Sequence, residues 1–78
     1  LHFKFDGEVS IHYDYYAPDK RVRDLMNVVS VVDKFFQDAM VVRGCILADD
    51  TSIVKNLSAR YMGVEKGNSR IEATIKAI

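Results

Sequence analysis

The chain has 78 residues, of which 49% are hydrophobic and 28% are charged. This composition is typical of one small globular domain and excludes a disordered chain; a core of this size is modest, so pairing with a second copy is a real prospect. Lys and Arg together number 11, as do Asp and Glu, so the formal net charge is zero and any contact with nucleic acid depends on a local basic patch.

The expected setting is reducing and cytoplasmic. No apolar run approaches the roughly 20 residues that span a bilayer, and no segment resembles a secretory signal. Cys45 is the only cysteine, which excludes an intrachain disulfide and a cysteine-based zinc site. His2 and His12 lie apart, so a histidine-rich metal site is not expected either. The chain begins at Leu1 and not at methionine, which raises the expectation of a missing N-terminal piece.

Two alternating segments open the chain. Residues 8–16 alternate with period two and are rich in aromatic and β-branched side chains, which predicts a half-buried strand. Residues 1–5 alternate too, and Asp6-Gly7 between the segments is a strong hairpin turn pair, so we expect the two strands to pair directly. Residues 17–21 then form an exposed break, because Pro18 cannot donate to a sheet and Asp19 favours a turn.

Residues 23–43 form the one long periodic segment. Apolar side chains recur there at i, i+3, i+4 and i+7, which predicts a helix with one apolar stripe. The stripe consists of Leu25, Val28, Val29, Val32, Phe36, Ala39 and Met40. A strand over residues 28–32 is the alternative, but about twenty residues without Gly or Pro exceed a typical strand. Gly44 supplies a helix stop. The opposite face, which we expect to meet solvent or a ligand, carries Asp33, Lys34, Gln37 and Asp38.

A connection over residues 45–51 leads to two more alternating segments, residues 53–61 and 70–77, with a turn-rich stretch at residues 65–68 between them. They predict an antiparallel hairpin with one buried and one wet face. The predicted fold class is therefore α+β, an antiparallel or mixed sheet with one long helix packed on it, in the order β-β-α-β-β. The aromatic residues assigned to the core or to an interface are Tyr13, Tyr15, Tyr16, Phe35 and Phe36.

Two acidic positions are candidates for metal chemistry. Asp24 opens the helix, and Asp49-Asp50 follow it. If they meet, their carboxylates suit magnesium, which prefers oxygen ligands and can activate water for phosphodiester hydrolysis. A helix of about twenty residues is roughly 30 Å long, so they meet only if the loop folds back, if the helix ends early, or across a dimer interface. The local pattern favours simpler roles, Asp24 as a helix N-cap and Asp49-Asp50 as a polar turn.

A basic cluster precedes the helix. Lys20, Arg21 and Arg23 lie together and are placed to contact a DNA backbone. A solvated loop is the alternative, and composition alone favours it. Lys34 on the wet helix face is likewise most often only solvated, and Asn27 lies where polar residues are common in a first turn.

The order of these features carries a family resemblance. The helix opens with Asp24-Leu25-Met26-Asn27, and Gly44, a short apolar run and Asp49-Asp50 follow it before the closing strands. This arrangement resembles the RusA family of Holliday-junction endonucleases, in which an Asp-x-Asp-Asn motif opens the central helix and a Gly, a few apolar residues and an Asp-Asp pair come after it. The resemblance extends from about Tyr13 to the closing strands, which is most of the chain.

The resemblance implies a single domain over residues 1–78 and a homodimeric, magnesium-dependent enzyme, often encoded by phages or prophages, that cuts four-way DNA junctions. The residues it assigns to catalysis and metal binding are Asp24, Asp49 and Asp50, with Asn27 in support. The DNA contacts expected beside them are Lys20, Arg21, Arg23 and Lys34. A two-fold dimer suits a junction with approximate two-fold symmetry, and we expect Tyr16, Phe35, Met62 or the sheet edge at its interface.

Two positions depart from the family pattern. Met26 stands where the motif has its second aspartate, and a thioether is a poor ligand for magnesium. Ser30 replaces the motif lysine, although Lys34, one turn further along, can reach the same phosphate. Three interpretations follow: a junction-cutting enzyme, a branched-DNA-binding module that Met26 has disabled for cleavage, and a protein-interaction domain consistent with the zero net charge.

Overall fold

The strand with the strongest alternation lies at the centre of the sheet. In the computed structural model, which describes residues 4–78, β1 (Val9–Ala17) buries every second residue, from Val9 to Ala17. It pairs on one side with β2 (Val54–Val64), which runs parallel, and on the other with β3 (Arg70–Ala77), which runs antiparallel. The result is a three-stranded mixed sheet in the order β2-β1-β3.

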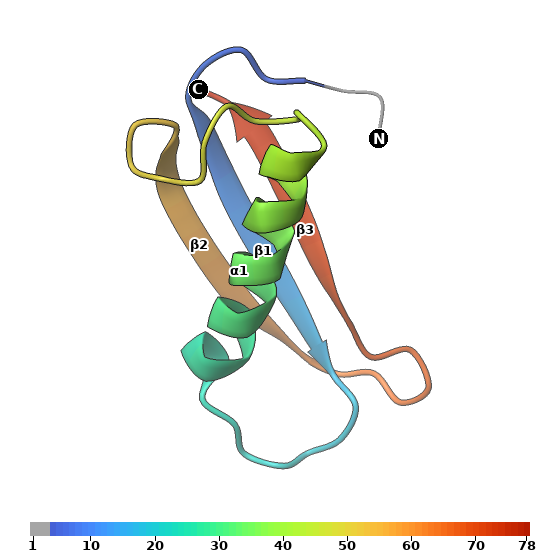
Figure 1. The fold of residues 1–78 in the computed structure, drawn as a ribbon. Helices are drawn as coiled ribbons and strands as arrows, with labels where there is room; N and C mark the ends of the chain where they lie inside the picture. Colours follow the sequence, from blue (N-terminus) through green and yellow to red (C-terminus); the bar gives the residue numbers. More distant parts are fainter. Residues whose placement is uncertain (1–3) are drawn as a thin grey trace.

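The helix α1 (Leu25–Val42) crosses one face of this sheet (Figure 1). Val29 and Met40 of its apolar stripe are buried, and Leu25, Val32 and Phe36 are partly buried against the core. The predicted helix is confirmed, although Ala39 is exposed and does not belong to the buried stripe. The α+β class with one helix on a mixed sheet is confirmed as well.

Both ends of α1 are defined by local hydrogen bonds. Asp24 is the N-cap, and its side chain accepts from the Met26 backbone N–H at 3.0 Å. At the other end Gly44 adopts φ 73°, its N–H donates to Val41 O at 3.0 Å, and the Cys45 N–H donates to Met40 O at 2.8 Å. This is a Schellman motif, and it makes Gly44 the helix stop that the sequence predicts.

Two predicted strand pairings are wrong. β2 and β3 do not form a hairpin, because β1 lies between them and takes the hydrogen bonds of both. With both edges of β1 occupied, no preceding strand can pair with it either. The predicted strand over residues 1–5 lies partly outside the described residues; residues 4 and 5 are not in a strand, and the Phe5 N–H donates to Cys45 O at 2.7 Å. Within the described residues the order is β-α-β-β.

The core is built around β1 and extends beyond the regular elements. Cys45 and Ile46, which the sequence assigned to a connection, are buried with it. The sheet face that α1 covers is protected only near β1: Leu57 and Tyr61 of β2 point to the same face and are 54% and 52% exposed. The predicted buried face of the closing strands is therefore largely open. No helix within residues 4–78 is long and apolar enough to cross a membrane.

Candidate nucleic-acid interface

The loop between β1 and α1 is folded around Asp19. One oxygen of this carboxylate accepts from the Arg21 backbone N–H at 2.9 Å and from Arg23 Nη2 at 2.6 Å. The backbone hydrogen bond, followed by the Arg23 side chain, lowers the pKa of Asp19. The side chains of Lys20 and Arg21 are exposed and form no ion pair within residues 4–78. The loop thus presents two available cations beside one that is held in place.

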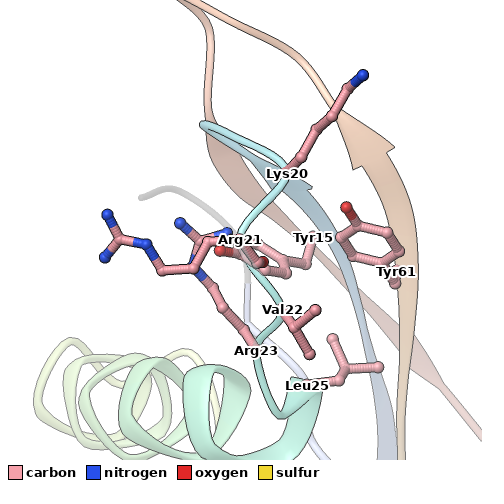
Figure 2. A pocket seen from close by; sticks show the side chains of 7 residues that line it. All are labelled: Tyr15, Lys20, Arg21, Val22, Arg23, Leu25 and Tyr61. Carbon is pink, nitrogen blue, oxygen red and sulfur yellow. The ribbon is translucent and has the colours of Figure 1, made fainter.

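The basic loop and the neighbouring strands enclose a groove of about 350 Å³. Figure 2 shows the rings of Tyr15 and Tyr61 side by side at one wall, opposite Val22 and Leu25. The two ring centroids are 6.0 Å apart. Lys20, Arg21 and Arg23 complete the lining. The sequence-predicted basic cluster therefore comes together, and it does so next to aromatic side chains.

The acidic residue at the start of α1 has a structural role. Asp24 is exposed, and one of its oxygens caps the helix through Met26. Met26 itself is 60% exposed, so an aspartate in its place would project into solvent at the same end of α1. Asn27 is exposed, and its carbonyl accepts from the Ser30 hydroxyl at 3.5 Å. The first turn of the helix thus exposes two polar side chains and one apolar side chain beside the basic loop.

Asp49 and Asp50 lie in the loop that follows α1. Both are exposed. One oxygen of Asp50 accepts from the Ser52 hydroxyl and from the Ser52 backbone N–H, the latter at 2.9 Å. These two hydrogen bonds, with the charge of Lys55 as a smaller contribution, lower the pKa of Asp50. Asp50 therefore stabilises the turn before β2, and one of its oxygens accepts no hydrogen bond from the described residues.

The two acidic positions are not brought together within one chain. α1 has 18 residues and is therefore about 27 Å long. Its start and the loop after it lie at opposite ends of the molecule (Figure 1). No group of three or more His, Cys, Asp or Glu side chains within residues 4–78 is arranged to hold a metal ion. The helix does not end early, and the loop after it does not fold back toward Asp24. Of the three ways in which the acidic positions could meet, only contact across a dimer interface is left.

Lys34 is separate from the basic loop. It is exposed on α1, ten residues after the N-cap, which places it about 15 Å along the helix axis from Asp24. Its side chain forms no ion pair within the described part of the chain. Lys34 therefore belongs to the middle of the helix surface and not to the groove.

One polar cluster was assigned to the wrong environment by the sequence. Gln37 was placed on the wet face of the helix, but it is buried, and its amide donates to Asp33 Oδ1 at 2.8 Å. The buried Tyr13 hydroxyl donates to the same oxygen at 2.5 Å. Burial, together with the hydrogen bond to Asp33 and its charge, raises the pKa of Tyr13. The spacing of Asp33 and Gln37 on the helix gave no signal of this, since the tyrosine comes from β1.

A second polar cluster lies on the sheet face that α1 does not cover. His12 Nδ1 is 2.6 Å from Ser58 Oγ, and His12 Nε2 is 2.8 Å from Asp14 Oδ1. These residues come from neighbouring positions of β1 and β2. Sequence reasoning did not connect Ser58 with His12, because parallel pairing joins residues that are far apart in the chain.

The sequence matches no protein-family model, and no curated protein matches it.

Proposed function

We propose that the chain is a magnesium-dependent endonuclease of the RusA type that acts on four-way DNA junctions as a homodimer. The observation that carries the proposal is the basic loop: Lys20 and Arg21 are exposed, form no ion pair within residues 4–78, and lie a few residues before Asp24 in the loop that leads into α1. Cations of this kind position a phosphate backbone. The acidic start of α1 then lies beside the DNA that the loop holds.

The distance between Asp24 and Asp49-Asp50 supports a site shared by two subunits. In a two-fold dimer with antiparallel α1 helices, the start of each helix lies beside the end of its partner. The outer surface of α1, which faces away from the sheet, provides a second set of apolar side chains for this pairing. Val31, Phe35 and Val42 are 58%, 69% and 85% exposed. Burying these three exposed side chains in a dimer would also add apolar contacts to a protein whose core is small in one chain.

The donor set fits magnesium. Asp24 and Asp50 each use one carboxylate oxygen in a local hydrogen bond, which leaves a second oxygen for a ligand, and Asp49 is exposed. Hard carboxylate oxygens are the protein ligands that magnesium prefers. Bound there, the ion would activate water and neutralise charge on the phosphate. Lys20 and Arg21 would hold the flanking phosphates. Lys34 would contact the backbone of the junction arm, a DNA duplex, that runs along α1.

Complementation between two inactive variants tests the shared site. Asp24→Asn and Asp50→Asn each remove one half of it. In a mixed dimer of the two, one composite site has both aspartates and the other has neither, so nicking of one strand should return while each variant alone stays inactive. If the mixture is as inactive as its components, the shared site is wrong. The assay uses a labelled four-way junction with magnesium.

Met26 supports a second candidate, a module that binds branched DNA without cutting it. Its exposed thioether replaces a carboxylate beside Asp24 and is a poor magnesium ligand. Comparing the chain with its Met26→Asp variant on the same junction separates the candidates. Cleavage by the variant alone identifies a disabled nuclease, and the complementation is then done in that background. Absence of salt-dependent junction binding by both proteins would leave a protein-interaction domain without nucleic acid.

A further inference from the structure

The groove beside the basic loop combines two kinds of chemistry. Its aromatic and apolar lining comes from Tyr15, Tyr61, Val22 and Leu25, and its rim carries three cationic side chains. A site for phosphate alone needs no aromatic wall, and a site for an apolar ligand gains nothing from cations. A nucleotide has both a flat π-face and a negative charge, which matches the two parts of the lining.

Tyr61 is the side chain best placed to contact a base. It lies on β2, an edge strand, and is 52% exposed, whereas Tyr15 is 8% exposed. The ring of Tyr15 lies against that of Tyr61, with 57° between their planes. Tyr15 therefore supports Tyr61 from the sheet side and leaves the remaining ring surface open. A ring held in this way loses little side-chain entropy when a ligand binds.

The size and charge of the groove limit what can enter it. A volume of about 350 Å³ lies at the low end of ligand pockets, which span roughly 300–1,000 Å³, so the groove suits one nucleotide and not a duplex. Another groove, of about 330 Å³ between α1 and β2, includes Met26 and Leu57 but also the Asp33 carboxylate. That carboxylate repels phosphate, so of these two grooves the first is the one that fits an anionic ligand.

We infer that the groove binds one unpaired nucleotide of a branched DNA, with its base stacked on Tyr61 and its phosphate held by Lys20 and Arg21. This inference rests on the proposed function, since it names the part of the DNA that the basic loop selects. Paired bases cannot reach Tyr61 because their faces are covered in the duplex. The groove therefore gives preference for positions where a base is free, as at a bulge or at a branch point whose neighbouring base pairs have opened.

The test uses two duplexes that differ by a single unpaired 2-aminopurine in the middle of one strand. Binding of each is measured for the unaltered chain, Tyr61→Ala, Tyr61→Phe and the control Leu57→Ala. Leu57 lies on the same strand and face, is 54% exposed, and does not line the groove. Tyr61→Ala should weaken binding of the bulged duplex by about tenfold, the loss typical of one base–aromatic stack. Tyr61→Phe and Leu57→Ala should bind it within about twofold of the unaltered chain, because a phenyl ring also stacks.

Stacking also has a direct optical readout, since 2-aminopurine fluorescence falls when the base stacks on a ring. Quenching by the unaltered chain and by Tyr61→Phe, but not by Tyr61→Ala, supports the inference. Equal binding of both duplexes, or an equal loss on both for Tyr61→Ala, overturns it while salt-dependent DNA binding still supports the proposed function. If neither duplex nor a four-way junction binds, both proposals fall.

Discussion

β1 and β2 are neighbours in one sheet, yet their surroundings differ sharply. Every second side chain of β1 is buried, whereas Val54 is the one buried residue of β2. A helix with its side chains is roughly 10–12 Å across and strands lie about 4.8 Å apart, so one helix above the central strand covers the outer strands only in part. The central strand therefore holds the fold together, while the edge strand offers apolar and aromatic groups to a ligand or partner.

Matched truncations on β1 and β2 should give the largest difference between the two strands. Ile11→Ala in β1 removes a side chain that is 1% exposed, and we expect the free energy of unfolding to fall by about 2–5 kcal/mol. Leu57→Ala in β2 should cost about 0.5 kcal/mol or less, as at other open surface positions. Denaturant unfolding of both variants measures the difference. Equal losses would mean that the exposed face of β2 is covered in solution.

The buried tyrosine of β1 gives a second, pH-dependent test. Tyr13→Phe removes the hydroxyl that donates to Asp33, and we expect a loss of about 1.5–3 kcal/mol at neutral pH, the range for a hydrogen bond to a charged group. Folding raises the pKa of Tyr13 above its ordinary value of 10.0. Its stabilising contribution is therefore complete below pH 10.0 and is lost as the pH rises toward the raised value, because the unfolded state ionises first.

The measurement is the difference in unfolding free energy between the two proteins across alkaline pH. The difference should shrink above about pH 10, where the tyrosine of the unfolded chain ionises. A difference that stays constant there would show that Tyr13 has the same pKa in both states, and the buried network would then contribute nothing to the pH dependence.

In β2 we expect a change of backbone conformation to lower stability more than truncation of an exposed side chain does. A β-bulge in β2 makes Met62 the extra residue, so that Gly63 pairs with Tyr16. Gly63 adopts φ 108°. Apart from Gly63 itself and its two chain neighbours, no atom of the described residues lies within 4 Å of the place that an alanine Cβ would take. The cost of Gly63→Ala therefore comes from the backbone conformation alone, about 1–2 kcal/mol. Gly7→Ala is the control, since its surroundings are equally open and its φ is not positive. Thermal unfolding of both variants should show a loss for Gly63→Ala only.

The smallest effect is expected on the polar face shared by the two strands. The hydrogen bond with His12, followed by the charges of His12 and Arg60, lowers the pKa of Asp14. The contribution of Asp14 to stability is therefore present above its unfolded pKa of about 3.9 and is lost as the pH falls through the lowered value. Asp14→Asn should be slightly less stable than the unaltered chain at neutral pH and equally stable in strong acid. A gap that persists in acid would contradict the pKa shift.

The sequence by itself determined the local elements. Alternation in β1, the apolar stripe of α1, the Asp24 cap and the Gly44 stop are encoded by neighbouring residues, because each depends on spacing or on hydrogen bonds within a few positions. The grouping of Lys20, Arg21 and Arg23 is local for the same reason. These features were predicted and are present, while their role in binding DNA stays a prediction.

The tertiary structure alone decided which strands pair and which side chains meet. β1 lies between β2 and β3, so the turn at residues 65–68 does not close a hairpin. Turn residues indicate that the chain reverses direction, but they do not indicate whether another strand lies between the two that they connect. The same arrangement places Tyr61 beside Tyr15 and joins Tyr13 to Asp33. It also holds Asp24 and Asp49-Asp50 at opposite ends of a rigid helix, a separation set by the rise of about 1.5 Å per residue.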